Sequence, residues 1–314
     1  MYNNNTIAVI VPAYNEELLL PITINSMPDY VDHIIIINDC SKDRTKEIMN
    51  ELADNNPKII TIHHNENKGL GQSLIDGYIE SKKTNATITA VMAGDNQMHP
   101  DDLSKILDKI LDKNYDYVKG NRLLHQNISD MPRYRFFGNA LLTILTKFAT
   151  GYYFLMDPQC GYTAIKNSAL NIIPIEKMTK GYGYNADILC MLNIHRFKTS
   201  DIEVTPVYGR EKSNIKLWKY IPNVSYLLLR LFFRRIWQRY IILDFHPLVL
   251  FYLFAFINTI FVILPFSARF FYMFNKYNEL PKTTLSIIVV TLLISFQSII
   301  FAIWMDMDYN KDRR

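Results

Sequence analysis

The chain has 314 residues, of which 49% are apolar, and its formal net charge is +4. This length exceeds what one small domain needs and is compatible with one sizeable domain plus an appendage. The sequence contains neither a basic domain nor a recognisable binding module, so nothing in it favours a nucleic-acid partner.

The first 120 residues alternate short apolar runs with helical patterns. The apolar runs are rich in β-branched residues, which is typical of strands buried on both faces. We therefore predict an α/β fold, a mostly parallel, doubly wound sheet wrapped by helices, whose ligands bind outside the carboxyl ends of the strands. The predicted strands are 6–13, 33–39, 58–64, 86–94 and 115–120, and the predicted helices are 16–27, 41–55, 70–83 and 100–113.

The first two predicted strands end in polar motifs. "PAYNEE" (12–17) follows the first strand, and either it forms a binding loop or Asn15 caps the next helix. "INDCSKD" (37–43) ends the second strand, where the carboxylate of Asp39 can accept N–H bonds from a nucleobase. Asn38 beside it offers both a donor and an acceptor.

A later run, "VMAGDNQMHP" (91–100), ends a strand at a single acidic residue, Asp95. Magnesium is typically bound through one or two carboxylates plus substrate phosphates, so one carboxylate suffices if a diphosphate supplies the other ligands. Gln97 can add its carbonyl oxygen. The alternative is that Asp95 caps the helix that begins near Pro100.

Basic residues follow the later strands. Guanidinium groups bind phosphate bidentately and keep their charge, which makes arginines natural ligands for diphosphates and phosphate monoesters. Their role depends on convergence in space, since each one alone also fits an exposed surface position. The candidates are Arg122, Arg133, Arg135, Arg210 and Lys212.

Two long segments near the end of the chain carry no charge, 22 residues after His246 and 23 residues after Lys282. Each exceeds the roughly 20 residues that cross a hydrocarbon core, and core helices of soluble proteins rarely lack a polar face over this length. We predict a two-helix transmembrane hairpin over 246–306, with spans at about 247–268 and 283–305.

The segment 215–245 mixes Leu, Phe, Trp and Tyr with arginines. This pattern predicts amphipathic juxtamembrane helices whose apolar face lies in the headgroup region, and a helix packed on the catalytic domain is the alternative. Seven Lys and Arg residues flank the spans on the outside against three between them, which predicts an integral membrane protein with both termini in the cytoplasm. The rest of the chain is then a cytoplasmic catalytic domain, 1–214, and a tail, 307–314.

The first residues, "MYNNNT", have neither the basic nor the apolar stretch of a signal peptide. The three cysteines are an odd number without metal-ligand spacing, so we expect reduced thiols in a cytoplasmic domain. They are Cys40, Cys160 and Cys190.

The order of these motifs resembles the family 2 glycosyltransferases. The N-terminal series is "VIVPAYNEE", "IINDCSKD", "NKGLGQSL", "VMAGDNQMHP" and "VKGNR". The later pieces "MPRYRFFGN", "DPQCGYTAI", "GYGYNADIL" and "VYGREKSNI", followed by two spans, resemble the polyprenyl-phosphate (dolichol-phosphate) branch of that family. Single motifs are weak, but nine in order over essentially the whole chain are a strong signal. The resemblance implies a nucleotide-sugar-binding fold of the GT-A type.

The resemblance also implies roles for particular residues. Asp95 and Gln97 match the metal-binding pair of the branch's acidic motif. The residues implied around the nucleoside are Pro12, Ala13, Tyr14, Glu16, Asn38 and Asp39. The residues implied at the acceptor phosphate are Arg122, Arg133, Arg135, Asn139, Arg210 and Lys212, and the implied catalytic groups are Asp95, Arg122, Arg135 and Arg210.

Three positions depart from the family pattern. Ala93 stands where many members carry the first Asp of an acidic pair, which predicts weaker metal binding without nucleotide. Asn38 replaces a frequent Asp, and this bears on nucleotide preference. Cys40 replaces a common glycine.

The predicted reaction is inverting transfer of a sugar from a UDP-glucose- or GDP-mannose-type donor to a membrane polyprenyl or dolichyl phosphate, with Mg²⁺ or Mn²⁺ as cofactor. A homo-oligomer is compatible with the spans. One alternative is a transferase acting on a lipid or glycan hydroxyl, with Asp187 as its base. Another is a catalytically inactive membrane assembly factor. A processive polysaccharide synthase is disfavoured because the sequence lacks a Gln-x-x-Arg-Trp motif.

Overall fold

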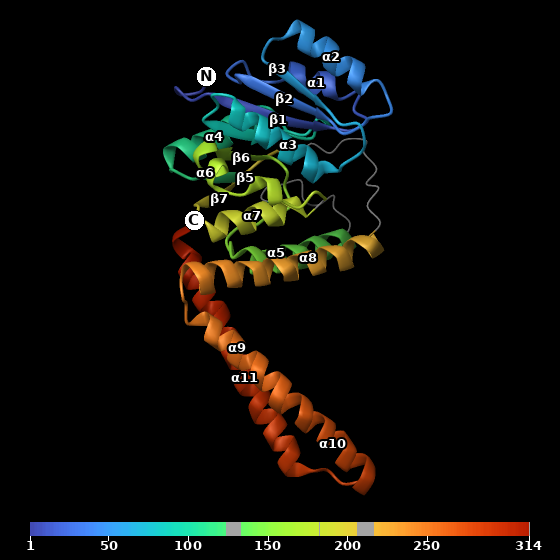
Figure 1. Cartoon of the computed structure of the whole chain (residues 1–314), viewed down its shortest axis with the longest axis vertical. Coiled ribbons are helices and arrows are strands. Elements are labelled where there is room, and N and C mark those ends of the chain that lie inside the picture. Colours follow the sequence, from blue (N-terminus) through green and yellow to red (C-terminus); the bar gives the residue numbers. More distant parts are fainter. Residues whose placement is uncertain (124–132, 182, 206–216, 314) are drawn as a thin grey trace. The chain divides into compact units, whose positions relative to one another are not determined.

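The computed structural model describes residues 1–123, 133–181, 183–205 and 217–313 (Figure 1). They form two compact units, Met1–Arg235 with the last residues from Arg313, and Ile236–Asp312. The first unit is α/β and the second is helical. The boundary between the units falls inside the segment predicted to be juxtamembrane, and the sequence-based divisions at 214 and 245 stay predictions.

Within the described residues, the first unit contains a seven-stranded sheet with the order β3-β2-β1-β4-β6-β5-β7. Neighbouring strands are parallel except at β6, which is antiparallel to both β4 and β5. The prediction of a mostly parallel α/β sheet is therefore confirmed. The strands are β1 (Ile7–Ala13), β2 (His33–Asn38), β3 (Ile59–His63), β4 (Ile88–Val91), β5 (Tyr117–Asn121), β6 (Thr163–Lys166) and β7 (Thr199–Glu203).

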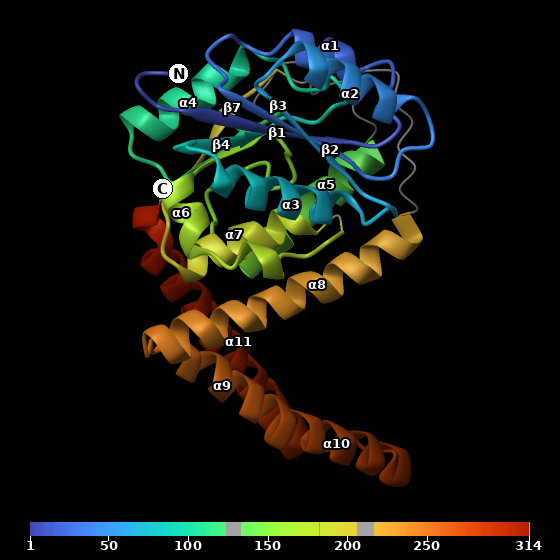
Figure 2. The same ribbon diagram turned by 45° about the horizontal axis from the view of Figure 1, so that its top comes forward.

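Helices cover both faces of this sheet (Figure 2). Every residue of β1 is buried, and alternate residues face opposite sides. Ile7, Val9 and Val11 join a core with α1, α2 and α4, whereas Ala8 and Ile10 join a core with α3, α6 and α7. Because both faces are covered, the strands read as continuous apolar runs. The helices are α1 (Leu20–Asn25), α2 (Thr45–Asn55), α3 (Leu70–Lys83), α4 (Asp102–Asp112), α5 (Arg133–Thr150), α6 (Asn167–Ile172), α7 (Tyr184–Ile194) and α8 (Leu217–Trp237).

Helix α8 packs on the first unit through α5 and α7 in a small apolar cluster that includes Ala149, Cys190 and Leu231. The Arg235 side chain is fully buried, and its guanidinium donates to the carbonyl oxygens of Ala149 at 3.1 Å and Phe148 at 2.9 Å. These carbonyls lie in the last turn of α5, where the helix itself offers them no partner. Arg235 therefore caps α5 from α8, as the packed-helix alternative for this segment predicts.

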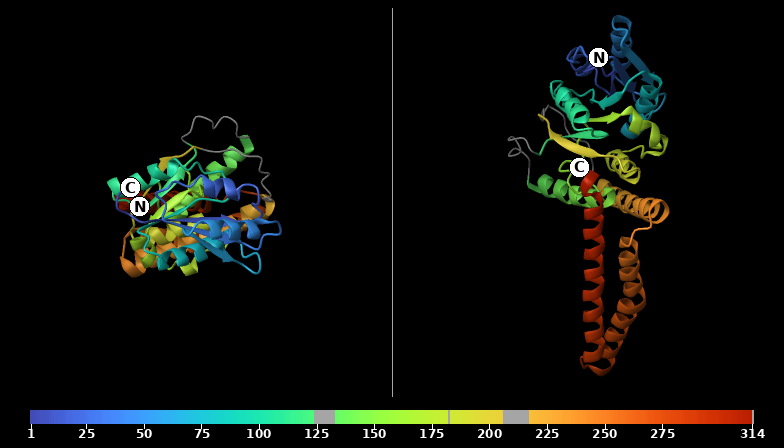
Figure 3. Two further views of the ribbon diagram at one scale, coloured as in Figure 1. Left: turned by 90° about the horizontal axis from the view of Figure 1, so that it is seen from above. Right: turned by 90° about the vertical axis from the view of Figure 1, so that its left-hand side faces the viewer.

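The second unit is a helical hairpin in which α9 and α10 run alongside α11 (Figure 3). The helices Leu248–Tyr277 and Lys282–Arg313 are long and apolar enough to cross a membrane, and only 17% of the most apolar window of each is buried. A core helix of a soluble protein would be mostly buried, so this exposure agrees with the two predicted spans. The elements are η3 (Gln238–Leu243), α9 (Leu248–Asn258), η4 (Thr259–Ile263), α10 (Leu264–Tyr277), α11 (Lys282–Asn310) and η5 (Lys311–Arg313).

The two long helices meet through small and polar side chains. The Asn258 amide donates to Ser295 Oγ at 2.7 Å and to the Thr291 carbonyl oxygen at 3.1 Å. Ser298 and Ala302, four residues apart, are also buried on α11. Lipid is as apolar as the side chains of a membrane helix, so the hydrophobic effect does not drive such helices together. Close packing of small residues and side-chain hydrogen bonds stabilise their contact instead.

Candidate active site at the carboxyl edge of the sheet

Three neighbouring strands end together and bring the predicted nucleotide and metal segments into contact. The Asp39 N–H after β2 donates to the Ala13 carbonyl oxygen at 3.0 Å. The Gly94 N–H after β4 donates to the Pro12 carbonyl oxygen at 3.1 Å. Pro12 and Ala13 thus lie at the centre of this edge, where the sequence predicts them.

The loops after β1 and β2 bind each other before any ligand is considered. The Asn15 N–H donates to Ser41 Oγ at 3.0 Å, and Asn15 Oδ1 accepts from the Lys42 N–H at 2.8 Å. The Asn38 side chain is buried and its Oδ1 accepts from the Ser41 N–H at 2.9 Å. Tyr14 is 43% exposed on this edge, which leaves its ring accessible to a ligand.

The capping alternative for "PAYNEE" is wrong. Helix α1 begins only at Leu20, its N-cap is Leu19, and Asn15 has a left-handed backbone with φ +58°. The N–H of Glu16, which is half-buried, donates to Thr45 Oγ1 at 2.8 Å. The motif is therefore a loop that the first turn of α2 holds in place.

Asp39 is buried, and both of its oxygens have partners inside the protein. Its Oδ1 lies 2.7 Å from His64 Nδ1 and accepts from the Lys68 N–H at 2.8 Å. Its Oδ2 accepts from the Gly69 N–H at 2.8 Å, just before α3. His64 Nε2 lies 2.9 Å from Asp76 Oδ2, so the histidine bridges two carboxylates.

These contacts give Asp39 an internal role in shaping the turn into α3. The predicted contact of Asn38 and Asp39 with the nucleobase stays a prediction. His64 and Asp76 carry no role in the sequence interpretation. His64 ends the predicted strand 58–64 and Asp76 lies within the predicted helix 70–83, and nothing in the sequence shows that they meet.

The loop after β4 places Asp95 and Gln97 side by side. Asp95 Oδ1 accepts from the Gln97 N–H at 3.1 Å, and Asn96 between them has φ +55°. The N-cap of α4 is Asp101, so the alternative in which Asp95 caps that helix is wrong. Among the described residues no group of three or more His, Cys, Asp or Glu side chains comes together to hold a metal ion.

The chemistry of these two side chains nevertheless suits a hard divalent cation. The Asp95 carboxylate and the Gln97 carbonyl are both oxygen donors on one tight turn, and both residues are half-buried. Magnesium is held in this way when phosphates supply the other ligands. Ala93 has no side-chain oxygen, so this loop offers the ion the side-chain oxygens of Asp95 and Gln97 but none from position 93.

Arg122 is held by a carboxylate that sequence reasoning missed. Its Nε and Nη2 donate to Asp157 Oδ2 and Oδ1 at 2.8 and 3.2 Å, and its backbone N–H donates to Oδ2 at 3.3 Å. The Asp157 side chain is 5% exposed and that of Arg122 is 45% exposed. A paired guanidinium fork fixes the direction of the remaining N–H groups, so Asp157 orients Arg122 at the end of β5.

Tyr184 connects the acidic loop to the arginine. Burial, with added repulsion from nearby Cys160 and Asp95, raises the pKa of the Tyr184 phenol, while Arg122 acts in the opposite direction. A Cβ atom on Gly161 would lie 3.2 Å from Met98 Cε and 3.3 Å from the Tyr184 hydroxyl. Met98 of the loop after β4 thus lies beside Gly161 and Tyr184, and Gly161 ends the loop 157–161 in which Asp157 binds Arg122.

Asp187 is buried on α7, and both of its carboxylate oxygens accept hydrogen bonds. Its Oδ2 accepts from the Thr179 N–H at 2.8 Å and from Thr179 Oγ1 at 2.7 Å. Its Oδ1 accepts from Arg234 Nη1 of α8 at 2.9 Å. These contacts favour a structural role in holding α8, although the base role itself stays a prediction.

The other predicted phosphate ligands lie outside the side chains that the structure describes, so their roles stay predictions. Arg133, Arg135 and Asn139 lie on α5, but their side chains are outside the described residues, and Arg210 and Lys212 lie in the segment 206–216, which is also outside them.

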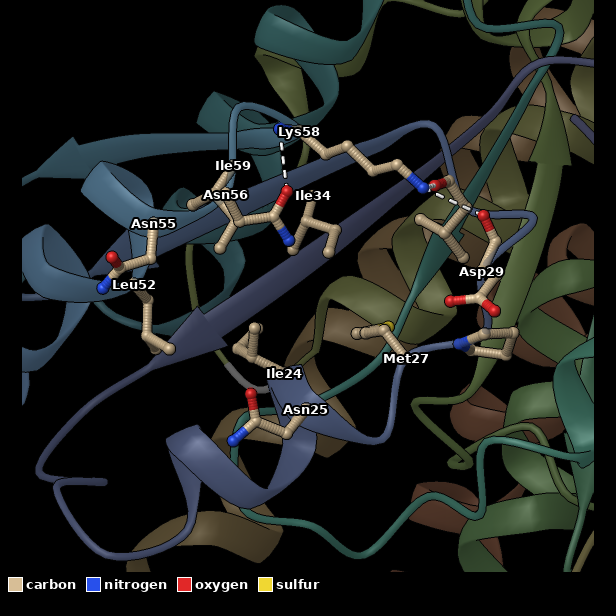
Figure 4. Close-up of a pocket in the computed structure, with 12 residues that line it drawn as sticks. Ile24, Asn25, Met27, Asp29, Ile34, Leu52, Asn55, Asn56, Lys58 and Ile59 are labelled. Atoms are coloured by element: carbon tan, nitrogen blue, oxygen red, sulfur yellow. Dashed lines mark hydrogen bonds between the residues drawn. The ribbon is translucent and has the colours of Figure 1, made fainter.

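A pocket of about 370 Å³ lies at the other edge of the sheet (Figure 4). It is lined by Ile24 and Asn25 of α1 and by Ile34 and Ile59 at the starts of β2 and β3. The Lys58 ammonium beside it donates to the Asp29 and Val31 carbonyl oxygens at 2.9 and 2.8 Å. The pocket contains none of the predicted site residues and lies at the amino ends of the strands, where such folds do not bind their substrates.

The mixed sheet, with Asp95 and Arg122 after strands that end at its carboxyl edge, agrees with the predicted nucleotide-sugar-binding fold of the GT-A type. The model of Glycosyl transferase family 2 matches residues 8–171. The chain belongs to this family and is a glycosyltransferase.

Two relatives are similar over about two thirds of the chain. The UDP-N-acetylglucosamine–dolichyl-phosphate N-acetylglucosaminyltransferase of Methanococcus voltae is 31% identical over 216 residues, covering 64% of this chain and 86% of the relative. The polyprenol monophosphomannose synthase of Mycolicibacterium smegmatis is 25% identical over 202 residues, covering 63% and 76%.

Among solved structures, glucosyl-3-phosphoglycerate synthase of Mycobacterium tuberculosis in complex with Mn²⁺, UDP and glucosyl-3-phosphoglycerate has a TM-score of 0.55 at 18% identity. The alignment covers 74% of this chain and 80% of that structure. At this identity the likeness shows the fold alone.

Proposed function

We propose that this glycosyltransferase transfers a sugar from a nucleotide-diphosphate sugar to a polyprenyl or dolichyl phosphate in a membrane. The observation that carries the proposal is that the loop after β4 packs through Met98 on the loop 157–161, whose Asp157 fixes Arg122, in a chain with two helices long enough to span a bilayer. The names of the relatives support the acceptor class, because each includes a dolichyl or polyprenol phosphate compound.

The acceptor phosphate supplies the nucleophile in this reaction. A phosphate monoester carries about −1.5 to −2 charges at pH 7, so its oxygen attacks the anomeric carbon without a general base. The C–O bond to the donor diphosphate breaks as the new C–O bond forms on the opposite face, which inverts the anomeric centre. This chemistry is consistent with a site in which Asp187 is committed to Thr179 and Arg234.

Arg122 would position the acceptor. Bringing two anions together is opposed by their repulsion, and a fixed guanidinium offsets it while it orients the attacking oxygen. Asp157 keeps Arg122 in one direction, so less ordering is needed when substrate binds. Arg135 and Arg210 are proposed to complete this set of cations.

Asp95 and Gln97 would hold a divalent cation, Mg²⁺ or Mn²⁺, at the donor diphosphate. When bound, the ion supplies charge neutralisation on the departing nucleoside diphosphate. Tyr14 would contact the nucleoside from the loop after β1, whose geometry is set by its bonds to the β2 loop.

The surface formed by α5 and α8 suits a position at the bilayer. Leu141 and Ile144 of α5 are 59% and 51% exposed, and Tyr226 and Phe233 of α8 are 71% and 61% exposed. Large apolar side chains with neighbouring arginines favour the headgroup region. We propose that this surface meets the cytoplasmic leaflet, with both termini on the same side.

A donor screen tests the proposal. The full-length protein in detergent is incubated with labelled UDP- and GDP-sugars, UDP-glucose, GDP-mannose and UDP-N-acetylglucosamine among them, and with a short polyprenyl phosphate. The matched control acceptor is the corresponding polyprenol without phosphate. We expect one donor to label the phosphorylated lipid only. Labelling of the free alcohol would support the alternative in which the acceptor is a hydroxyl. If no lipid is labelled and neither UDP nor GDP raises the melting temperature, the alternative of a catalytically inactive assembly factor would be supported.

A further inference from the structure

A buried histidine at the carboxyl edge of the sheet has no part in the mechanism above. His64 follows β3, and its backbone N–H donates to the Asn38 carbonyl oxygen, at the end of β2, at 2.9 Å. Only 3% of the His64 side chain is exposed. A buried imidazole needs partners for both ring nitrogens, and here both partners are carboxylates.

The two carboxylates come from different elements. His64 Nδ1 lies 2.7 Å from Asp39 Oδ1 after β2, and Nε2 lies 2.9 Å from Asp76 Oδ2 on α3. Ionised carboxylates only accept, so each contact uses an N–H of the ring. The side chain of Asp76 is 26% exposed, and its Oδ1 accepts from Gln72 Nε2 at 3.0 Å. Asp76 therefore has water and Gln72 as other partners, whereas the side chain of Asp39 is only 6% exposed.

Asp39 uses three acceptor sites inside the protein. Its Oδ1 accepts from His64 Nδ1 and from the Lys68 N–H, and its Oδ2 accepts from the Gly69 N–H. A carboxylate has about four lone-pair sites. Within the described part of the chain, one site on Oδ2 is thus left for a ligand, and a single N–H of a nucleobase would fill it.

The contact with His64 also supports the turn before α3. The two N–H groups of this turn, those of Lys68 and Gly69, both donate to Asp39, and Gly69 has a left-handed backbone with φ +87°. The Asp39 backbone is held from the other side, because its N–H donates to the Ala13 carbonyl oxygen at the end of β1. The position of the carboxylate therefore depends on β1, on the turn and on His64.

We propose that His64 is a positioning residue for the donor nucleotide, which acts through its Nδ1–H on Asp39. By holding Oδ1, the imidazole fixes the direction of Oδ2, the oxygen left to accept from the nucleobase. The inference rests on the proposed use of a nucleotide-sugar donor. It assigns to the donor site a residue that does not touch the ligand.

Two substitutions at position 64 separate the two contacts. In His64→Asn the side-chain Nδ2 takes the place of the imidazole Nδ1, so the bond to Asp39 is kept and the bond to Asp76 is lost. In His64→Gln the side-chain Nε2 takes the place of the imidazole Nε2, so the bond to Asp76 is kept instead. Both variants lose the ring and one bond, so a role in packing alone would affect both alike.

The test measures binding of UDP and of GDP, each with Mn²⁺, to the full-length protein in detergent by calorimetry. For the nucleotide that the wild type binds more tightly, His64→Gln should bind about tenfold more weakly, because a hydrogen bond to a charged group is lost. His64→Asn should stay within about threefold of the wild type. In turnover, KM for the donor should rise about tenfold in His64→Gln, with kcat and the acceptor KM little changed. Thermal unfolding verifies that both variants are folded.

Asp76→Asn is the matched control. Its amide nitrogen can donate to Nε2 while its oxygen accepts from Gln72, so Nδ1–H still donates to Asp39, and nucleotide affinity should stay within about twofold of the wild type. The inference is overturned if folded His64→Gln binds as tightly as the wild type, or if His64→Asn and His64→Gln lose affinity equally. Wild-type protein that binds neither nucleotide would overturn the proposed donor class and this inference with it. Nucleotide binding that is indifferent to position 64 would overturn this inference alone.

Discussion

The bidentate contact between Arg122 and Asp157 allows a quantitative test of the site. In Asp157→Asn the shape is kept, but the carboxylate that fixes the guanidinium is lost. Hydrogen bonds between charged groups contribute about 1.5–3 kcal/mol each, and Asp157 is buried while Arg122 is 45% exposed, so water replaces part of what is lost. We expect a fall in kcat/KM of about 10- to 100-fold, which corresponds to about 1.4–2.8 kcal/mol.

A double-mutant cycle separates orientation from charge. Arg122→Lys keeps the positive charge but cannot make the two parallel bonds to Asp157. If Asp157 acts by orienting Arg122, the double variant should be within about threefold of Arg122→Lys alone. The assay is the initial rate of sugar transfer with donor and acceptor varied separately.

A matched control is Lys83→Gln, which removes an exposed ion pair to Glu80 at the far end of α3. Such pairs contribute about 0–1 kcal/mol, so we expect activity within about twofold of wild type. The orientation argument is refuted if the two effects at Arg122 and Asp157 multiply, or if Asp157→Asn is as active as the control.

Three further predictions concern neighbouring positions. Asp95→Ala should abolish transfer, whereas Ala93→Asp should bind Mn²⁺ more tightly in the absence of nucleotide, as measured by calorimetry; full activity of Asp95→Ala would exclude the metal site there. Asp187→Asn should lower kcat less than tenfold while reducing thermal stability, because it weakens the contact with Arg234; a loss of several orders of magnitude in a folded protein would instead indicate a base. Gly161→Ala should reduce kcat/KM by about tenfold with little change in folding, since its methyl group would lie 3.2 Å from Met98 Cε and 3.3 Å from the Tyr184 hydroxyl, closer than ordinary contact. An unchanged rate would show that Met98 and Tyr184 can move aside without an effect on catalysis.

The sequence predicts the sheet well because its signals are local. The β-branched runs of β1, β2 and β4 directly report burial on both faces, and the polar residues after them necessarily meet at one edge. The antiparallel β6 and the short α1 are not predicted, because pairing direction and helix length depend on tertiary contacts. Asn15 shows the same dependence on tertiary contacts. Asparagine is a residue type typical of helix N-caps, but here it joins the loops after β1 and β2.

The candidate site is only partly predictable for the same reason. Asp95 and Arg122 can be found because they follow predicted strands, but the carboxylate that orients Arg122 lies far away in the sequence. Asp157 is 35 residues from Arg122. No periodicity or motif reports such contacts.

The cap that Arg235 forms on α5 has a mechanical consequence. Its bonds to the Phe148 and Ala149 carbonyls fasten the end of α8 to the end of α5. A force that tilts α8 is therefore transmitted to the helix that bears Arg133 and Arg135. Under the proposed membrane placement, changes in lateral pressure or surface charge of the bilayer would shift the helix that carries these two arginines, which are predicted to bind the lipid phosphate, and turnover would vary with the composition of the leaflet.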